Sequence, residues 1–292
     1  MKLSPLLIAL LIVVSASAEE LPDISSVTPD LVVPEMMRGE PAAGQRVRQT
    51  TPGWEKTEVH HALYLPRDWQ PERKWPVIIE WAGNGNYRNK FGDESTGRVE
   101  GSNLGYGLTA GEGAIWVCVP YLNAAGTANV ITWWGDPPGY DPQPTLAYTR
   151  ATVRFVCEKF GGDPACVVLA GFSRGAIAAN YLGLHDDATA PLWRAFICYS
   201  HYDGVRAAWP YPGADRASAR ARLQRLAGRP QFICGEGPNA ADTERYLREI
   251  GAWEQGEFTA LGTGFRNHND AWILRPSPAR TRLREWLGEV IR

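Results

Sequence analysis

A Gly-x-Ser-x-Gly motif is the feature of this chain that points most directly to chemistry. The segment reads Cys166-Val-Val-Leu-Ala-Gly171-Phe-Ser173-Arg-Gly175-Ala-Ile. Its apolar residues predict a buried strand, and the small residues that follow predict the start of a helix. A serine in a tight turn between strand and helix presents its hydroxyl as a nucleophile, and the glycines leave room where a Cβ would clash. The alternative role of Ser173 is to cap the helix.

This segment resembles the nucleophile elbow of the α/β-hydrolases, and the resemblance covers roughly residues 56–292. It rests on the chain order of an early strand, the Gly-Asn-Gly loop at 83–85, the elbow and the late His268. The order is most similar to that of exported feruloyl esterases, acetylxylan esterases and polyhydroxybutyrate depolymerases, which implies ester hydrolysis through an acyl-enzyme. The chain departs from those enzymes at Arg174 and Ala176. An arginine after the serine is instead similar to glucuronoyl esterases, whose motif is matched only in part.

The resemblance also implies where the base and the acid stand, because both follow the serine in the chain order of this fold. Of the five histidines, only His268 lies beyond the last predicted strand and just before the terminal helix, where the fold presents its base. The acid is expected after the seventh strand. Asp242 is the first candidate because its loop gives it reach, and Glu236, directly at the strand end, is the second. Asp203, after the sixth strand, is the third, and the alternative role of Asp242 is a helix cap.

Acyl transfer also needs two backbone N–H groups aimed at the developing oxyanion. The resemblance places one at Arg174 and the other in the loop at 82–86, with Asn84 preferred and Gly85 next. An ordinary Gly/Asn turn explains the same loop. Two interpretations of the Arg174 side chain stay open: its guanidinium serves the oxyanion or a substrate carboxylate, or it pairs with a nearby acid.

Aromatic residues near the expected site indicate the kind of substrate. Trp133 and Trp134 follow the fourth predicted strand, and their rings would suit sugar rings or phenolic acyl groups, although core packing explains them equally well. His201, after the sixth strand, is expected on the same rim. The expected partner is a small-molecule or polysaccharide ester, with no cofactor. No metal site is expected, because the chain lacks C-x-x-C and paired histidine spacings.

Charge and the first residues limit partners and compartment. The formal net charge of -2 gives no electrostatic reason to expect nucleic acid or an anionic membrane as a partner. Residues 1–18 combine one lysine, an apolar run too short for a membrane span and an Ala-Ser-Ala ending. They predict a signal peptide cleaved after Ala18 and a secreted or periplasmic protein, the alternative being an uncleaved anchor. In an oxidising compartment, Cys157 and Cys166 could form a disulfide.

The elements that must position these residues are predicted from apolar runs. Nearly continuous runs at 75–81 and 114–119 predict strands covered on both faces. The second half alternates strand and helix up to a terminal helix at 278–290, and the Gly-rich stretch 84–112 predicts a functional loop. The predicted class is α/β, with the α/β-hydrolase fold, a mostly parallel central sheet and helices on both faces. Three parts are expected: a signal peptide at 1–18, an extended segment at 19–54 and a catalytic domain at 55–292.

Together these features predict an exported serine hydrolase that cleaves carboxylic esters through a Ser-His-acid triad and an acyl-enzyme. Two alternatives stay open. A serine peptidase of the prolyl oligopeptidase type has the same catalytic order, and an inactive α/β-hydrolase that only binds carbohydrate would keep the fold without the chemistry. The presence of both Ser173 and His268 favours an enzyme.

Overall fold

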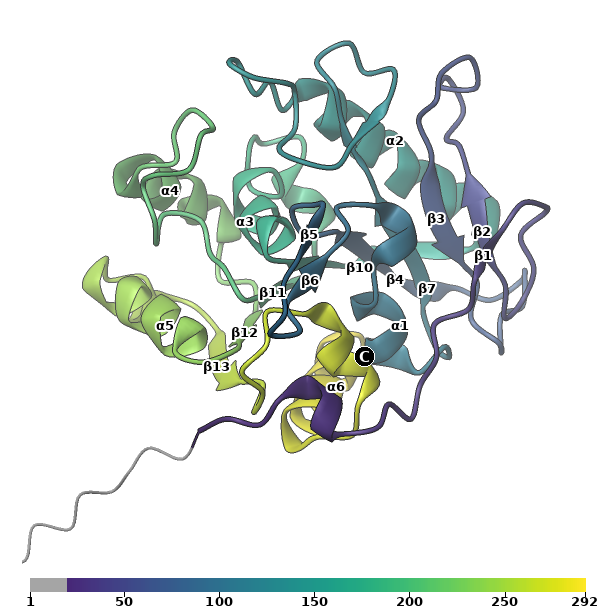
Figure 1. Ribbon diagram of the computed structural model, residues 1–292. Helices are drawn as coiled ribbons and strands as arrows, with labels where there is room; N and C mark the ends of the chain where they lie inside the picture. The colour runs from purple at the N-terminus through teal and green to yellow at the C-terminus, as the bar shows by residue number, and fades with distance from the viewer. Residues whose placement is uncertain (1–19) are drawn as a thin grey trace, which may run out of the picture.

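A nine-stranded sheet forms the centre of the protein in a computed structural model that describes residues 20–292 (Figure 1). In their order across the sheet, the strands are β1 (Met36–Met37), β2 (Arg46–Gln49), β3 (His61–Tyr64), β7 (Ile115–Val119), β4 (Trp75–Trp81), β10 (Gly162–Phe172), β11 (Ala195–Tyr199), β12 (Gln231–Gly235) and β13 (Phe258–Gly262). From β7 onward along this order all neighbours are parallel, whereas β3 pairs antiparallel with both β2 and β7. The predicted mostly parallel sheet is confirmed.

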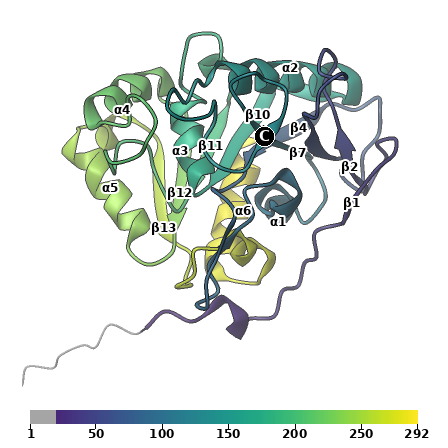
Figure 2. The same cartoon turned by 45° about the horizontal axis from the view of Figure 1, so that its top comes forward.

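Helices cover both faces of the sheet (Figure 2). They are α1 (Leu104–Thr109), α2 (Gln143–Phe160), α3 (Arg174–Tyr181), α4 (Arg216–Leu223), α5 (Asn239–Glu249) and α6 (Pro278–Val290). In β10, Val167 and Leu169 pack in the cluster beneath α2 and α3, while Val168 and Ala170 pack in the cluster beneath α1 and α6. A strand buried on both faces needs apolar side chains in both directions, and the continuous apolar runs supply them.

Shorter elements fill the connections. Two small hairpins are formed by β5 (Tyr87–Arg88) with β6 (Glu94–Ser95) and by β8 (Tyr121–Leu122) with β9 (Asn129–Val130). The 3₁₀ helices are η1 (Ile24–Ser26), η2 (Val99–Gly101), η3 (Ala190–Leu192), η4 (Gln224–Leu226), η5 (Trp253–Gln255) and η6 (Asp270–Leu274).

Two parts of the chain are more ordered than the sequence predicts. The segment expected to be merely extended contains β1 and β2. Strand β2 joins the sheet by pairing antiparallel with β3, and its Arg46 is buried with the guanidinium 4.7 Å from the Trp116 ring. The expected loop at 84–112 contains the hairpin β5–β6 and helix α1, which packs against the sheet through Leu104 and Leu108. The glycines within α1 hid its helical pattern.

The disulfide that Cys157 and Cys166 could form is absent from this structure, in which all five cysteines are free. Cys157 packs on the α2 face of the sheet, whereas the Cys166 thiol donates to the carbonyl oxygen of Ile291 at 3.6 Å, next to α6. The two thiols therefore lie on opposite faces. The predicted signal peptide lies outside the described residues. No helix in the described part of the chain is long and apolar enough to cross a membrane.

Candidate active site

Ser173 lies in a strained turn between β10 and α3. Its φ of 55° and ψ of -115° fall outside the regions that serine favours. A Cβ on Gly171 would lie 2.0 Å from the carbonyl oxygen of Gly175, and one on Gly175 would lie 1.9 Å from that of Trp81. Only glycine fits at both positions, so the spacing of the motif follows from the close contact of α3, β10 and β4.

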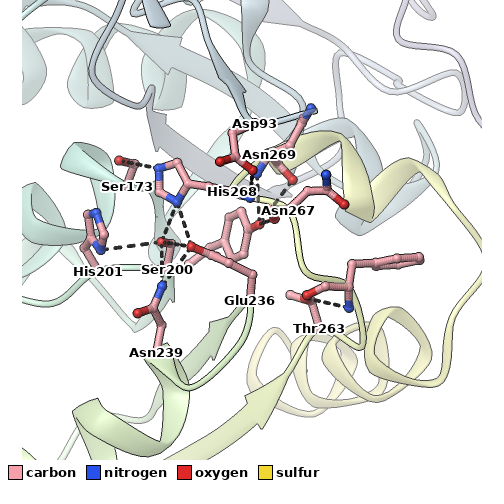
Figure 3. A network of polar contacts seen from close by, with 12 residues as sticks. Asp93, Ser173, Ser200, His201, Glu236, Asn239, Thr263, Asn267, His268 and Asn269 are labelled. Carbon is pink, nitrogen blue, oxygen red and sulfur yellow. Dashed lines mark hydrogen bonds and ion pairs between the residues drawn. The ribbon is translucent and has the colours of Figure 1, made fainter. Parts of the chain in front are cut away.

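His268 joins this serine to a carboxylate (Figure 3). Its Nε2 lies 2.9 Å from Ser173 Oγ, and its Nδ1 lies 2.7 Å from Oε1 of Glu236. The backbone N–H of His268 donates to Asp93 at 2.8 Å, and the ring centroid is 4.7 Å from that of Phe172. The imidazole is thus held by a distant loop and by the strand that carries the nucleophile.

The structure places Glu236, the second candidate, against the histidine. Asp242, the first candidate, lies in the first turn of α5 and pairs with Arg245 at 2.9 Å. The reason is that α5 begins at Asn239, three residues before Asp242, so Asp242 lies neither on a loop nor at the cap. Asp203 is buried against Arg222 and Tyr211, and burial raises its pKa to about 6. The ranking of the acids is therefore wrong.

The Glu236 carboxylate is surrounded by donors that the sequence did not single out. Ser200 Oγ lies 2.9 Å from its Oε1 and 2.8 Å from His268 Nδ1, and Asn239 donates to Oε1 at 2.8 Å. Burial would raise the pKa of Glu236, but the hydrogen bonds from His268 and Ser200 outweigh it, so the pKa is lowered. The position of Ser200 at the carboxyl end of β11 was the only sequence signal.

Two backbone N–H groups, those of Asn84 and Arg174, lack acceptors among residues 20–292. Both residues line the cavity that contains Ser173. The N–H of Gly85 donates to the carbonyl oxygen of Ile131 at 2.8 Å, so the prediction of Gly85 as an oxyanion donor is wrong. The backbone N–H groups of Asn84 and Arg174 therefore remain as the candidate oxyanion donors.

The cavity has a volume of about 660 Å³. Trp133 and His201 line it as expected, together with Trp209, which the sequence analysis missed. Trp134 does not, because it is fully buried between Tyr121 and Tyr181. The rings of the two adjacent tryptophans are nearly perpendicular, at 89°, so one faces the cavity and the other faces the core.

His201 is an uncharged side chain in the wall of this cavity. Burial, and then the proximity of His268, lower its pKa to about 4. Its ring centroid lies 5.1 Å from that of His268 and 5.7 Å from that of Trp209. No group of His, Cys, Asp and Glu side chains in the described chain is arranged to hold a metal ion.

The Arg174 side chain follows neither predicted interpretation. It is 1% exposed, and its Nη2 donates to the carbonyl oxygen of Gly83 at 2.7 Å, rather than to an acid or toward a substrate.

Comparison with known proteins addresses the fold. No protein family and no curated protein sequence matches the chain. A fungal esterase from Rhizomucor miehei matches with a TM-score of 0.56, over 84% of this chain and 82% of its own, at 12% identity. Thermogutta terrifontis esterase 2, phosphorylated by paraoxon, matches with a TM-score of 0.55, over 87% of this chain and 95% of its own, at 14% identity. The chain has the α/β-hydrolase fold.

Peptidases share this fold as well. A protein described as a dipeptidyl aminopeptidase IV from Bacteroides ovatus matches with a TM-score of 0.50, over 84% of this chain, at 12% identity. The chain spans only 35% of that peptidase and 62% of a thermostable esterase. These neighbours agree with the predicted fold.

Proposed function

We propose that this protein is a serine hydrolase that cleaves carboxylic esters at Ser173. The observation that carries the proposal is the unbroken hydrogen-bonded path from Ser173 Oγ through His268 to Glu236. Asn84 and Arg174, whose backbone N–H groups have no acceptor among residues 20–292, line the same cavity as Ser173. A nucleophile, a base with its acid and an oxyanion site are the parts that acyl transfer requires.

In the proposed reaction, Ser173 Oγ attacks the ester carbonyl carbon while His268 Nε2 takes the hydroxyl proton. The carbonyl oxygen becomes an oxyanion and accepts hydrogen bonds from the N–H groups of Asn84 and Arg174. Glu236 stabilises the imidazolium. When the tetrahedral intermediate collapses, the C–O bond to the alcohol breaks and His268 protonates the leaving oxygen. Water, deprotonated by His268, then attacks the acyl-enzyme carbonyl; the C–O bond to Ser173 Oγ breaks, His268 returns the proton to that oxygen, and the acid is released.

Two observations favour esters over peptides. The solved structures matched over most of their own length are esterases, whereas the peptidase is matched over 35%. The cavity wall includes the aromatic side chains of Trp133, Trp209 and Tyr87. Aromatic faces suit ring-bearing substrates, so we propose esters of carbohydrates or of phenolic acids.

Labelling with a fluorophosphonate tests the proposal directly, because such a probe reacts with an activated serine. The related probe paraoxon phosphorylates the Thermogutta esterase. We expect the label on Ser173 in the wild-type protein and none in Ser173→Ala, with kcat for a 4-nitrophenyl ester falling by about 10⁴ or more and an unchanged Tm. An unlabelled wild-type protein would indicate an inactive, carbohydrate-binding relative. Faster turnover of a peptide amide panel than of an ester panel would indicate a peptidase.

We further infer export, supported by the lysine, the apolar run and the Ala-Ser-Ala ending of residues 1–18. Amino-terminal sequencing of protein recovered outside the cytoplasm should begin at Glu19. Recovery of an intact chain in the cytoplasm would contradict this inference.

A further inference from the structure

A buried positive charge, with no acidic partner among residues 20–292, lies directly beneath the candidate active site. The Arg174 side chain is 1% exposed, and its guanidinium carbon lies 3.8 Å from the centroid of the Tyr121 ring. Its only hydrogen bond is the 2.7 Å contact to Gly83 O, and within the described residues its Nε and Nη1 have no acceptor. Burying a charge with unpaired N–H groups costs stability. Such an arrangement calls for a role other than stabilising the fold.

The acceptor of Arg174 belongs to the peptide unit that carries a candidate oxyanion donor. Gly83 contributes the carbonyl of that unit and Asn84 contributes the N–H. The bond between them is trans, and a trans peptide is planar, so its C=O and N–H point in opposite directions. A guanidinium that holds the Gly83 oxygen on one side therefore fixes the direction of the Asn84 N–H on the other. Asn84 lines the cavity with Ser173.

The preceding peptide is held from the same place. Tyr121 donates its hydroxyl to the carbonyl oxygen of Ala82 at 3.2 Å, while its ring supports the guanidinium. Tyr121 and Arg174 thus donate hydrogen bonds to two consecutive backbone carbonyl oxygens of the loop that follows β4. A charged donor on a carbonyl also polarises the whole peptide, which makes its N–H a stronger donor.

We propose that Arg174 builds the oxyanion site in two ways: its backbone N–H is one donor, and its guanidinium positions and polarises the other through the Gly83–Asn84 peptide. This inference rests on the proposed serine hydrolase function. The side chain is a positioning residue, since it touches the loop rather than the substrate. Removing the Arg174 side chain should therefore lower kcat for neutral and for anionic esters by the same factor.

The test compares Arg174→Met, Arg174→Lys and the control Arg46→Met. Methionine fills a similar volume without charge, and replacing a buried charge in this way is often neutral or stabilising. Removing one oxyanion donor costs about 10²–10³ in kcat. We expect Arg174→Met to lower kcat by about 10- to 10³-fold, with KM within about threefold of the wild type and an undiminished Tm. We expect the kcat of Arg174→Lys to lie between those of Arg174→Met and the wild type, because lysine keeps the charge.

Arg46 is a matched control because it is also a buried arginine beside an aromatic ring, Trp116, that donates to backbone carbonyls, those of Val99 and Glu100. We expect Arg46→Met to leave kcat unchanged, whatever its effect on Tm. Hydrogen–deuterium exchange of residues 82–86, measured without substrate, should accelerate in Arg174→Met but not in Arg46→Met.

Wild-type kcat in Arg174→Met, or unchanged exchange at 82–86, would overturn the inference. A loss confined to anionic esters would overturn it too and would assign the guanidinium to a substrate carboxylate. A wild-type protein that neither hydrolyses esters nor reacts with a fluorophosphonate would instead overturn the proposed function, so the two failures are distinguishable.

Discussion

At the scale of single residues, one carboxylate oxygen organises the site. Oε1 of Glu236 lies 2.7 Å from His268 Nδ1, 2.9 Å from Ser200 Oγ and 2.8 Å from Asn239 Nδ2. These contacts hold the carboxylate in its charged form despite burial, as its lowered pKa indicates. An anion fixed in this position keeps the proton of a neutral imidazole on Nδ1 and leaves Nε2 free to accept the proton of Ser173.

The assignment of the acid can be tested by two amide replacements. Glu236→Gln should lower kcat by about 10⁴ with little change in Tm, because an amide N–H facing Nδ1 favours the wrong imidazole tautomer. Asp242→Asn should leave kcat unchanged, because Asp242 only pairs with Arg245 on the half-exposed surface of α5. Steady-state kinetics on one ester compare them. Equal losses in both variants, or a loss in Asp242→Asn alone, would contradict the assignment.

At the scale of elements, the sequence predicted what apolar patterning controls. Buried parallel strands and the terminal helix have strong local signals, so β4 and α6 begin and end at the predicted residues. The distance between a loop carboxylate and His268 has no local signal. Because α5 starts at Asn239, Asp242 lies in the helix and does not reach His268. Likewise, the different directions of the Trp133 and Trp134 rings, which have no local signal, determine which ring lines the cavity.

The junction of β4, β10 and α3 offers a prediction about glycine. A Cβ on Gly175 would lie 1.9 Å from Trp81 O, a backbone atom of a central strand that cannot move without breaking the sheet. Gly175→Ala should therefore lower the free energy of unfolding by about 3 kcal/mol or more, or prevent folding. Gly288→Ala in α6 is the control. There a Cβ meets nothing within 4 Å, and alanine should stabilise the helix by up to about 1 kcal/mol.

Urea unfolding of the two variants measures this difference. A Gly175→Ala protein as stable as the wild type would mean that α3 can shift away from β4, and that the packing at the elbow does not fix the position of Ser173.

At the scale of the whole molecule, a buried polar cluster ties the histidine segment to the sheet. Asp270, two residues after His268, accepts from the side chain of Asn103 at 2.7 Å. Just beyond Asn103, the backbone N–H of Gly105 donates to Glu80 of β4 at 2.9 Å. The segment that carries the base, the start of α1 and a central strand are thus joined by two buried carboxyl groups on one face of the sheet.

This cluster predicts how stability depends on pH. Burial, and then the nearby Glu80, raise the pKa of Asp270 to about 8, whereas an unfolded aspartate titrates near 4. Between these values the folded protein binds more protons than the unfolded chain. The contribution of Asp270 to stability is therefore fully present below about pH 4 and is lost as the pH rises through about 8. Asp270→Asn removes this titration while keeping a neutral side chain of the same shape.

We therefore expect the free energy of unfolding of Asp270→Asn, relative to the wild type, to increase by about 3 kcal/mol between pH 6 and pH 9. Urea unfolding at several pH values within that window measures the difference, and using the difference cancels every other group that titrates there. Asp187→Asn, at an exposed position paired with Arg225, controls for the loss of one surface charge. If Asp270→Asn and the wild type instead give parallel curves across this range, Asp270 is ionised in the folded protein, and the cluster is held by a charged carboxylate.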